Sequence, residues 1–131
     1  MNASIITIGN ELLKGFTLDS NSSYIGSKLT DLGVRIVWKA TPEDNFDEII
    51  ETINIANSKS DIIICTGGLG PTIDDVTLKS FSKFINKKIL NDKKYLNILE
   101  KKYLERNIKM SKININQSCY IEDTNIIPND L

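Results

Sequence analysis

The feature that most constrains the fold is an apolar run that ends in a glycine-rich loop. Residues 62–65 (Ile-Ile-Ile-Cys) are uninterrupted apolar residues, and Thr66-Gly67-Gly68-Leu69-Gly70-Pro71-Thr72 follows directly. A short continuous apolar run is typical of a strand that is buried on both faces of a parallel sheet. Because parallel strands need long crossover connections, this segment predicts a domain in which strands alternate with helices.

The rest of the chain has that alternation. β-Branched or alternating segments predict strands over 4–8 and 34–39, and apolar residues at helical spacing predict helices over 20–32, 46–58, 75–86 and 92–107. We expect a turn at residues 9–15, and Ser20 or Asn21 as the cap of the first helix. A further strand is expected to start at Ile126–Ile127. The prediction is a parallel α/β domain whose ligand lies beyond the carboxyl ends of the strands.

Length and composition exclude several classes of protein. The chain has 131 residues, the size of one domain, and we see no internal repeat. It contains no histidine, which excludes Ser-His-Asp and Cys-His catalysis and histidine-ligated metals. Cys65 and Cys119 are too few for a disulfide framework, and Cys65 is expected to be a buried, inert thiol. With no signal peptide and no apolar stretch that could span a bilayer, we expect a cytoplasmic protein without a membrane partner.

Positive charge is concentrated in one part of the chain. Residues 79–112 hold eleven of the sixteen Lys and Arg residues but only three acids. One interpretation is that the lysine-rich helix near 93–109 binds nucleic acid, and the other is that it presents a solvated lysine face. No arginine cluster accompanies the lysines, so the solvated face is favoured and nucleic acid is not expected as a partner.

The glycine loop is the strongest candidate for a ligand site. Gly67, Gly68 and Gly70 let the backbone approach a ligand closely, and amides in such a turn before a helix bind phosphate or another oxyanion. Thr66 and Thr72 add hydroxyl donors. The sequence therefore predicts a phosphate-binding turn at residues 66–72, although it lacks the lysine of a nucleotide-binding P-loop.

Two carboxylates come after this turn. Asp74 and Asp75 would repel a bare phosphate, so they indicate more than an anion pocket. They could hold Mg²⁺ between themselves and a phosphate, or orient a hydroxyl or a water. The alternative is that Asp74 only caps the next helix.

Other polar residues come after the other predicted strands. Asn10 and Glu11 come after the first strand, Asp19 and Asn21 stand at the head of the first helix, and Asp44 comes after the second strand. Each could be a ligand or merely a turn or cap residue. In a parallel sheet all of them lie at the same edge as the glycine loop, so we expect one polar rim.

Five motifs together resemble a known family. They resemble, in order and spacing, the N-terminal domain of the competence/damage-inducible CinA proteins, which is similar to the molybdopterin-binding MoaB/Mog superfamily. The resemblance is strongest over residues 3–90. The motifs are Ile8-Gly9-Asn10-Glu11-Leu12-Leu13-Lys14-Gly15, Asp19-Ser20-Asn21, Leu32-Gly33, Asp44-Asn45 and Thr66-Gly67-Gly68-Leu69-Gly70-Pro71-Thr72-Ile73-Asp74-Asp75-Val76-Thr77.

This resemblance implies a single three-layer α/β/α domain over residues 1–131 with a mostly parallel sheet. It implies that the domain binds a phosphorylated pterin, such as molybdopterin, or a nucleotide at the carboxyl edge of that sheet. In Mog-type relatives two aspartates act at the pterin, and their positions here are Asp44 and Asp75. The resemblance to CinA proteins also implies hydrolysis of ADP-ribose with Mg²⁺, Mn²⁺ or Co²⁺. Asp74 and Asp75 would then hold the metal and orient water, with Glu11 as a helper.

The resemblance has departures and leaves alternatives open. The family continues past the position of Leu131, so we expect a domain that is incomplete at its C-terminus. Asp74 stands where Mog-type proteins have an arginine, which removes a phosphate-binding charge. The expected assembly is a homo-oligomer, a dimer or a trimer. The alternative functions are a non-catalytic molybdopterin-binding module and a truncated, interaction-only remnant.

Overall fold

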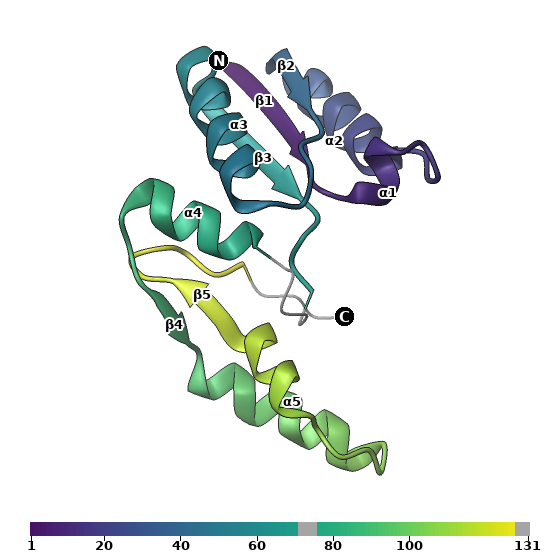
Figure 1. The fold of residues 1–131 in the computed structure, drawn as a ribbon, viewed down its shortest axis with the longest axis vertical. Coiled ribbons are helices and arrows are strands. Elements are labelled where there is room, and N and C mark those ends of the chain that lie inside the picture. Colours follow the sequence, from purple (N-terminus) through teal and green to yellow (C-terminus); the bar gives the residue numbers. More distant parts are fainter. Residues whose placement is uncertain (71–75, 128–131) are drawn as a thin grey trace.

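The computed structural model describes residues 1–70 and 76–127 (Figure 1). A parallel sheet with its helices forms one part of the molecule, and an antiparallel strand pair with a long helix forms the other. The elements in chain order are β1 (Asn2–Thr7), α1 (Asn10–Leu13), α2 (Ser20–Asp31), β2 (Arg35–Ala40), α3 (Phe46–Lys59), β3 (Ile62–Thr66), α4 (Thr77–Ile85), β4 (Ile89–Asn91), α5 (Lys93–Glu105), the 3-10 helix η1 (Lys112–Ser118) and β5 (Cys119–Ile121).

The parallel sheet has the strand order β2-β1-β3 among the described residues. Gly26 of α2 faces Ile5 of β1, whereas Ile6, the next residue of the strand, packs with Ile49 and Ile53 of α3. Successive residues of a strand point to opposite faces, so α2 and α3 cover opposite faces of the sheet. This arrangement confirms the expected three-layer α/β/α fold with a mostly parallel sheet.

The core lies between the sheet and α3. Its buried members are aliphatic residues of β1 and α3 and one that directly follows β1: Ile6, Ile8, Ile49, Ile53 and Ala56. Helical spacing brings the three α3 residues onto one face, which is why the apolar pattern of 46–58 predicted the helix. This packing places the end of β1 against α3, next to the carboxyl edge of the sheet.

The burial predicted for β3 is wrong. The continuous apolar run does form a strand, but all five of its residues are only partly buried. The reason is topological: β1 is the only strand that pairs with β3 in the part of the chain that the structure describes, so β3 lies at the edge of this sheet. The strand buried on both faces is β1, where Ala3, Ile5 and Ile6 have no exposed surface.

Helix starts differ slightly from the expected ones. Asp19, not Ser20 or Asn21, caps α2, since its carboxylate accepts a hydrogen bond from the backbone N–H of Ser22. Asn45 caps α3 in the same way. The predicted helix 75–86 begins at Thr77 within the described residues, and the predicted turn at 9–15 contains the short helix α1.

The sequence did not reveal the antiparallel pair. β4 and β5 have three residues each and pair Ile89 with Ile121 and Asn91 with Cys119. Strands this short carry no readable alternation, so the pairing depends on contacts between distant segments. Ile126 and Ile127, where a strand was expected to start, are irregular and exposed. No helix within 1–70 and 76–127 has the length and apolar character needed to cross a membrane.

Candidate functional site

Three elements meet through hydrogen bonds at the carboxyl edge of the sheet. Thr7, the last residue of β1, donates its hydroxyl proton to Oδ2 of Asp19 over 3.0 Å. Its Oγ1 is also 3.0 Å from Oγ1 of Thr41, which comes directly after β2. Because the carboxylate of Asp19 only accepts and Thr7 has one hydroxyl proton, Thr41 donates to Thr7. These hydrogen bonds join the ends of β1 and β2 to the start of α2.

Asp19 holds a negative charge in this network. Partial burial would raise the pKa of its carboxyl, but hydrogen bonds from Ser22 and Thr7 and the nearby charge of Lys39 outweigh burial and lower it. Both carboxylate oxygens accept hydrogen bonds from the protein itself, Oδ1 from the backbone N–H of Ser22 and Oδ2 from the hydroxyl of Thr7. Asp19 therefore builds the edge and caps α2.

A second contact joins the residues after β1 to those after β2. Oδ1 of Asn10, at the start of α1, accepts a hydrogen bond of 3.2 Å from the backbone N–H of Asp44. Asp44 is half-buried and directly precedes Asn45, the cap of α3. The structure therefore brings Asn10 and Asp44 together, as the expected polar rim requires. Glu11 and Asn21 are exposed, in the first turns of α1 and α2.

The glycine loop lies against the end of β1. Gly67 and Gly68 have φ angles of +93° and +59°, in the left-handed region that glycine adopts without strain. A Cβ at Gly67 would lie 1.9 Å from the carbonyl oxygen of Ile8, and one at Gly68 would lie 2.1 Å from Oγ1 of Thr77. No side chain fits at either position, so glycine is required here by both conformation and space.

Two hydrogen bonds fix this loop. The N–H of Ile8 donates to the carbonyl oxygen of Thr66 over 2.8 Å, which continues the β1–β3 ladder to the edge. The hydroxyl of Thr77, which is 3% exposed, donates to the carbonyl oxygen of Gly67 over 3.3 Å. The loop is thus held between the exit of β1 and the first turn of α4.

Sequence reasoning missed three threonines of this edge. Thr7 and Thr77 are buried, and Thr41 links two strand ends. A polar residue at the end of an otherwise aliphatic segment was the available signal for Thr7, and the motif Asp75-Val76-Thr77 contained the signal for Thr77. Neither pattern shows which partner the hydroxyl meets.

Several predicted site residues remain predictions. Thr72, Asp74 and Asp75 lie outside the described residues, so the structure tests no role for them. Thr66 ends β3 and is half-buried, and Gly70 is exposed. Within the described ranges, no group of three or more Cys, Asp or Glu residues is placed to hold a metal ion.

The cysteine of this edge is held in its thiol form. Burial raises the pKa of the Cys65 thiol to about 12, so almost none of it is thiolate at neutral pH. Cys65 is only partly buried, like the rest of β3, but its raised pKa supports the expected inertness of the thiol. Cys119, in β5, also has a pKa raised by burial.

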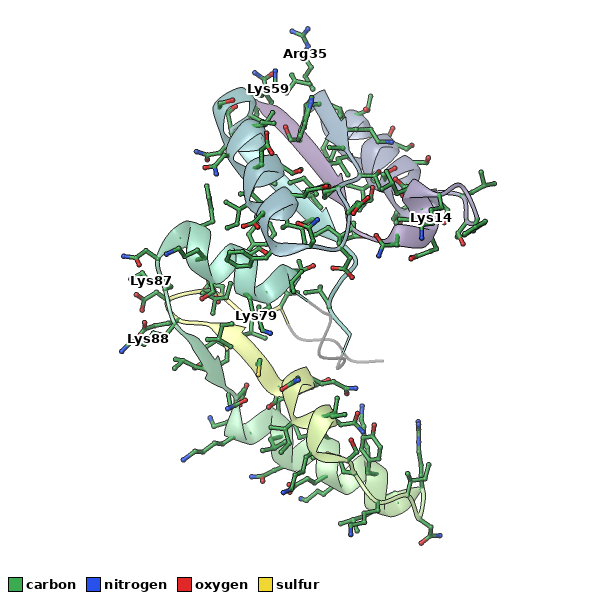
Figure 2. The ribbon with its side chains drawn as sticks, viewed as in Figure 1. Lys14, Arg35, Lys59, Lys79, Lys87 and Lys88 are labelled. Carbon is green, nitrogen blue, oxygen red and sulfur yellow. The ribbon has the colours of Figure 1, made fainter. Side chains whose placement is uncertain are left out.

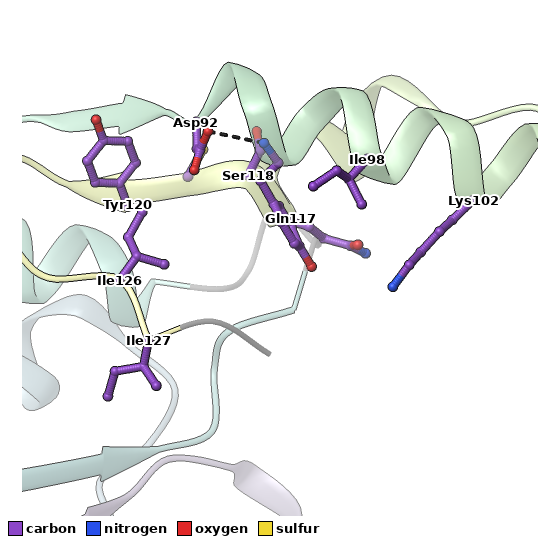
Figure 3. A pocket seen from close by; sticks show the side chains of 10 residues that line it. Asp92, Ile98, Lys102, Gln117, Ser118, Tyr120, Ile126 and Ile127 are labelled. Carbon is purple, nitrogen blue, oxygen red and sulfur yellow. Dashed lines mark hydrogen bonds between the residues drawn. The ribbon is translucent and has the colours of Figure 1, made fainter. Parts of the chain in front are cut away.

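A separate cavity of about 480 Å³ lies in the other part of the molecule (Figure 3). Among the described residues, its lining includes none from the sheet edge. Its walls come from α5, β5 and the residues next to them: Asp92, Tyr95, Ile98, Lys102, Gln117, Ser118, Cys119, Tyr120, Ile126 and Ile127. Asp92 is engaged as the cap of α5, where it accepts hydrogen bonds from the N–H groups of Lys94 and Tyr95.

Comparison with known sequences identifies the family of this chain. Residues 4–127 match the family described as a probable molybdopterin binding domain. A CinA-like protein of Dictyoglomus turgidum is 37% identical over 130 residues, which cover 99% of this chain and 32% of that protein. A putative competence-damage inducible protein of Caldicellulosiruptor saccharolyticus is 37% identical over 98% of this chain and 31% of its own length. The chain thus spans about a third of the length of the curated relatives that it matches.

Solved structures agree with the fold. The crystal structure of the protein CinA from Thermoplasma acidophilum, a protein described there as of unknown function, superposes with a TM-score of 0.87 and 34% identity. The match covers 99% of this chain and 76% of that one. The tungsten cofactor synthesizing protein MoaB of Pyrococcus furiosus has a TM-score of 0.60 at 24% identity, over 80% of this chain and 63% of that one, and so supports the fold alone. Since the family match spans nearly the whole chain and the fold agrees, the chain belongs to the molybdopterin-binding domain family, with CinA-like proteins among its relatives.

Proposed function

We propose that this domain binds a phosphorylated pterin or nucleotide at the carboxyl edge of its parallel sheet, with a phosphate against the glycine loop. The observation that carries the proposal is the geometry of Gly67 and Gly68, whose left-handed backbone occupies positions where no side chain fits. Successive backbone amides in such turns form concave sites for anions. Membership of the molybdopterin-binding domain family supports the same ligand class.

In this proposal Asp44 contacts the ligand and Asp19 does not. The oxygens of Asp19 already accept hydrogen bonds from Ser22 and Thr7, so its role is to hold the edge together. Asp44 is placed at the edge by the contact of its N–H with Asn10. Its carboxylate would accept hydrogen bonds from the N–H or hydroxyl groups of a pterin or ribose and so orient the ligand.

The second candidate function is hydrolysis of ADP-ribose to AMP and ribose 5-phosphate, which the similarity to CinA-like proteins favours. Such a reaction would use a divalent metal such as Mg²⁺, Mn²⁺ or Co²⁺. The carboxylates of Glu11, Asp19 and Asp44 do not form a metal-binding group. In this candidate the metal would be held by Asp74 and Asp75.

Calorimetry with molybdopterin, AMP and ADP-ribose tests the binding proposal. We expect saturable binding of at least one of these ligands, and binding weakened about tenfold or more by Asp44→Asn. The reason is that a hydrogen bond to a charged group contributes about 1.5–3 kcal/mol. Asp47→Asn is the matched control, because it makes the same change of charge in the first turn of α3 and should leave the affinity unchanged. A folded chain that binds none of the three ligands would contradict the proposal.

Release of AMP from ADP-ribose tests the second candidate. The chain would be incubated with Mg²⁺, Mn²⁺ or Co²⁺ and with EDTA as a control. We expect metal-dependent AMP release that Asp75→Ala abolishes. Binding without turnover would leave a non-catalytic binding module, and equal turnover by Asp75→Ala would exclude the role predicted for that residue.

A further inference from the structure

Four lysines line a groove outside the sheet edge. We call it the lysine groove; its volume is about 520 Å³. Lys79 and Lys83 are one helical turn apart on α4, and Lys87 and Lys88 lie in the connection to β4. Figure 2 labels Lys79, Lys87 and Lys88. The groove contains none of the edge residues described above.

The charge of this groove is only partly compensated. Lys87 pairs with Asp123, with Nζ 2.5 Å from Oδ2. Lys79, Lys83 and Lys88 have no ion-pair partner within residues 1–70 and 76–127, and Glu122 is the one acid in the lining. Like charges one turn apart on a helix repel each other, so an anion bound between them would relieve that repulsion.

The groove also has apolar surface. Phe46, at the start of α3, and Ile89, at the start of β4, both line it and are 38% and 37% exposed. A cavity of this volume is in the ordinary range of small-molecule sites, about 300–1,000 Å³. A flat aromatic ring could cover the face of Phe46, since such rings pack in offset or edge-to-face arrangements. Cations beside an exposed aromatic face suit a ligand that has both a phosphate and a ring.

We infer that the lysine groove binds a small organic phosphate that carries a planar ring, a ligand of the mononucleotide class. Its phosphates contact Lys79 and Lys83, and its ring packs on Phe46. This site is distinct from the proposed site at the glycine loop and does not depend on it. A merely solvated lysine face would provide the same charges without selecting a ring.

Two-dimensional ¹H–¹⁵N NMR of the full chain, titrated with ADP, tests the inference. We expect shifts of the amides of residues 79–89 and of Phe46 that saturate together. The double variant Lys79→Glu/Lys83→Glu should weaken this binding about tenfold or more, because attraction becomes repulsion at both contacts. The variant Lys94→Glu/Lys101→Glu makes the same change of net charge on α5, outside the groove, and should leave the affinity within about twofold.

The role of the ring needs its own comparison. Tripolyphosphate provides the anion without a ring, and adenosine provides the ring without an anion. We expect both to bind the lysine groove more weakly than ADP does, as reported by the same amide shifts. Phe46→Leu should lower the affinity for ADP to that for tripolyphosphate. Circular dichroism of each variant checks that the fold is retained.

Four results would overturn the inference. The first is that the shifts caused by ADP are confined to residues 66–70 and their neighbours, which would leave the proposed function intact. The second is an equal loss of affinity in the two double variants, which would indicate unspecific attraction of an anion. The third is that Phe46→Leu leaves the affinity for ADP unchanged, which would show that the ring of the ligand does not pack on Phe46. The fourth is a single-stranded oligonucleotide that binds these amides while ADP does not.

Discussion

Replacing Gly67 with alanine would place a methyl group 1.9 Å from the carbonyl oxygen of Ile8. A real Cβ essentially never comes closer than 3.0 Å to another heavy atom, so this oxygen and the loop must separate by about 1.1 Å. Neither side can move freely. Ile8 is 2% exposed in the core, and its N–H is hydrogen-bonded to Thr66.

The cost has two parts. A residue with a side chain in the left-handed region costs about 1–2 kcal/mol relative to glycine. Forcing a methyl group into a packed site typically costs a further 1–3 kcal/mol or so. We therefore expect Gly67→Ala to lower the free energy of unfolding by about 2–5 kcal/mol.

Gly33→Ala is the matched control. Gly33 also has a left-handed φ, +74°, but a Cβ there meets no atom within 4 Å, so only the conformational cost of about 1–2 kcal/mol applies. Urea unfolding of both variants, followed by the fluorescence of the single tryptophan, Trp38, gives the two free energies. Equal destabilisation would refute the close approach of the glycine loop to β1.

Three further predictions concern capping, reactivity and packing. Asp19→Ala should lower the free energy of unfolding by about 1 kcal/mol at pH 7, because the α2 cap is lost. The pKa of Asp19 is lowered in the folded state, so the stabilisation by its charge is complete above about pH 4 and is lost as the pH falls through the lowered pKa. The unfolding curves of wild type and variant should therefore converge in acid. In a Cys119→Ser background at pH 8, Cys65 of the folded protein should react with a thiol reagent about a thousandfold more slowly than Cys65 of the unfolded chain. The reason is that its pKa is about 12, against about 8.5 for a free thiol. Comparable reaction rates would show that solvent reaches the end of the strand. Ile53 has no exposed surface, so Ile53→Ala should lower the free energy of unfolding in urea by about 2–5 kcal/mol. Ile55, two residues further on, is 37% exposed, so Ile55→Ala should lower it clearly less. Equal losses would contradict the packing of α3 on the sheet.

Much of the parallel part was predictable from local patterns. The aliphatic segments at 4–8 and 62–65 and the helical spacing of Ile49 and Ile53 depend on residues close in sequence, so the strands and α3 were found. The edge of the sheet was predictable too, because parallel strands all deliver their next residues to the same side of the sheet. Asn10 and Asp44 do meet there.

Other features could not be predicted because they depend on contacts between distant segments. The pairing of β4 with β5 joins two strands of three residues that lack a pattern of their own. The cap of α2 could have been any of several polar residues, and only the structure shows that the carboxylate of Asp19 accepts the hydrogen bond from the N–H of Ser22.

The sequence by itself determined the strands and the longer helices of the parallel part and the need for glycines after β3, because periodicity and backbone freedom are properties of the local chain. Only the tertiary structure decided that β1, rather than β3, is the buried strand, since burial depends on the neighbours of a strand. It also decided that Gly67 lies against Ile8 and that Thr7 joins Asp19 to Thr41. These contacts link residues that only the folding of separate elements brings together, and they shape the edge where we place the ligand.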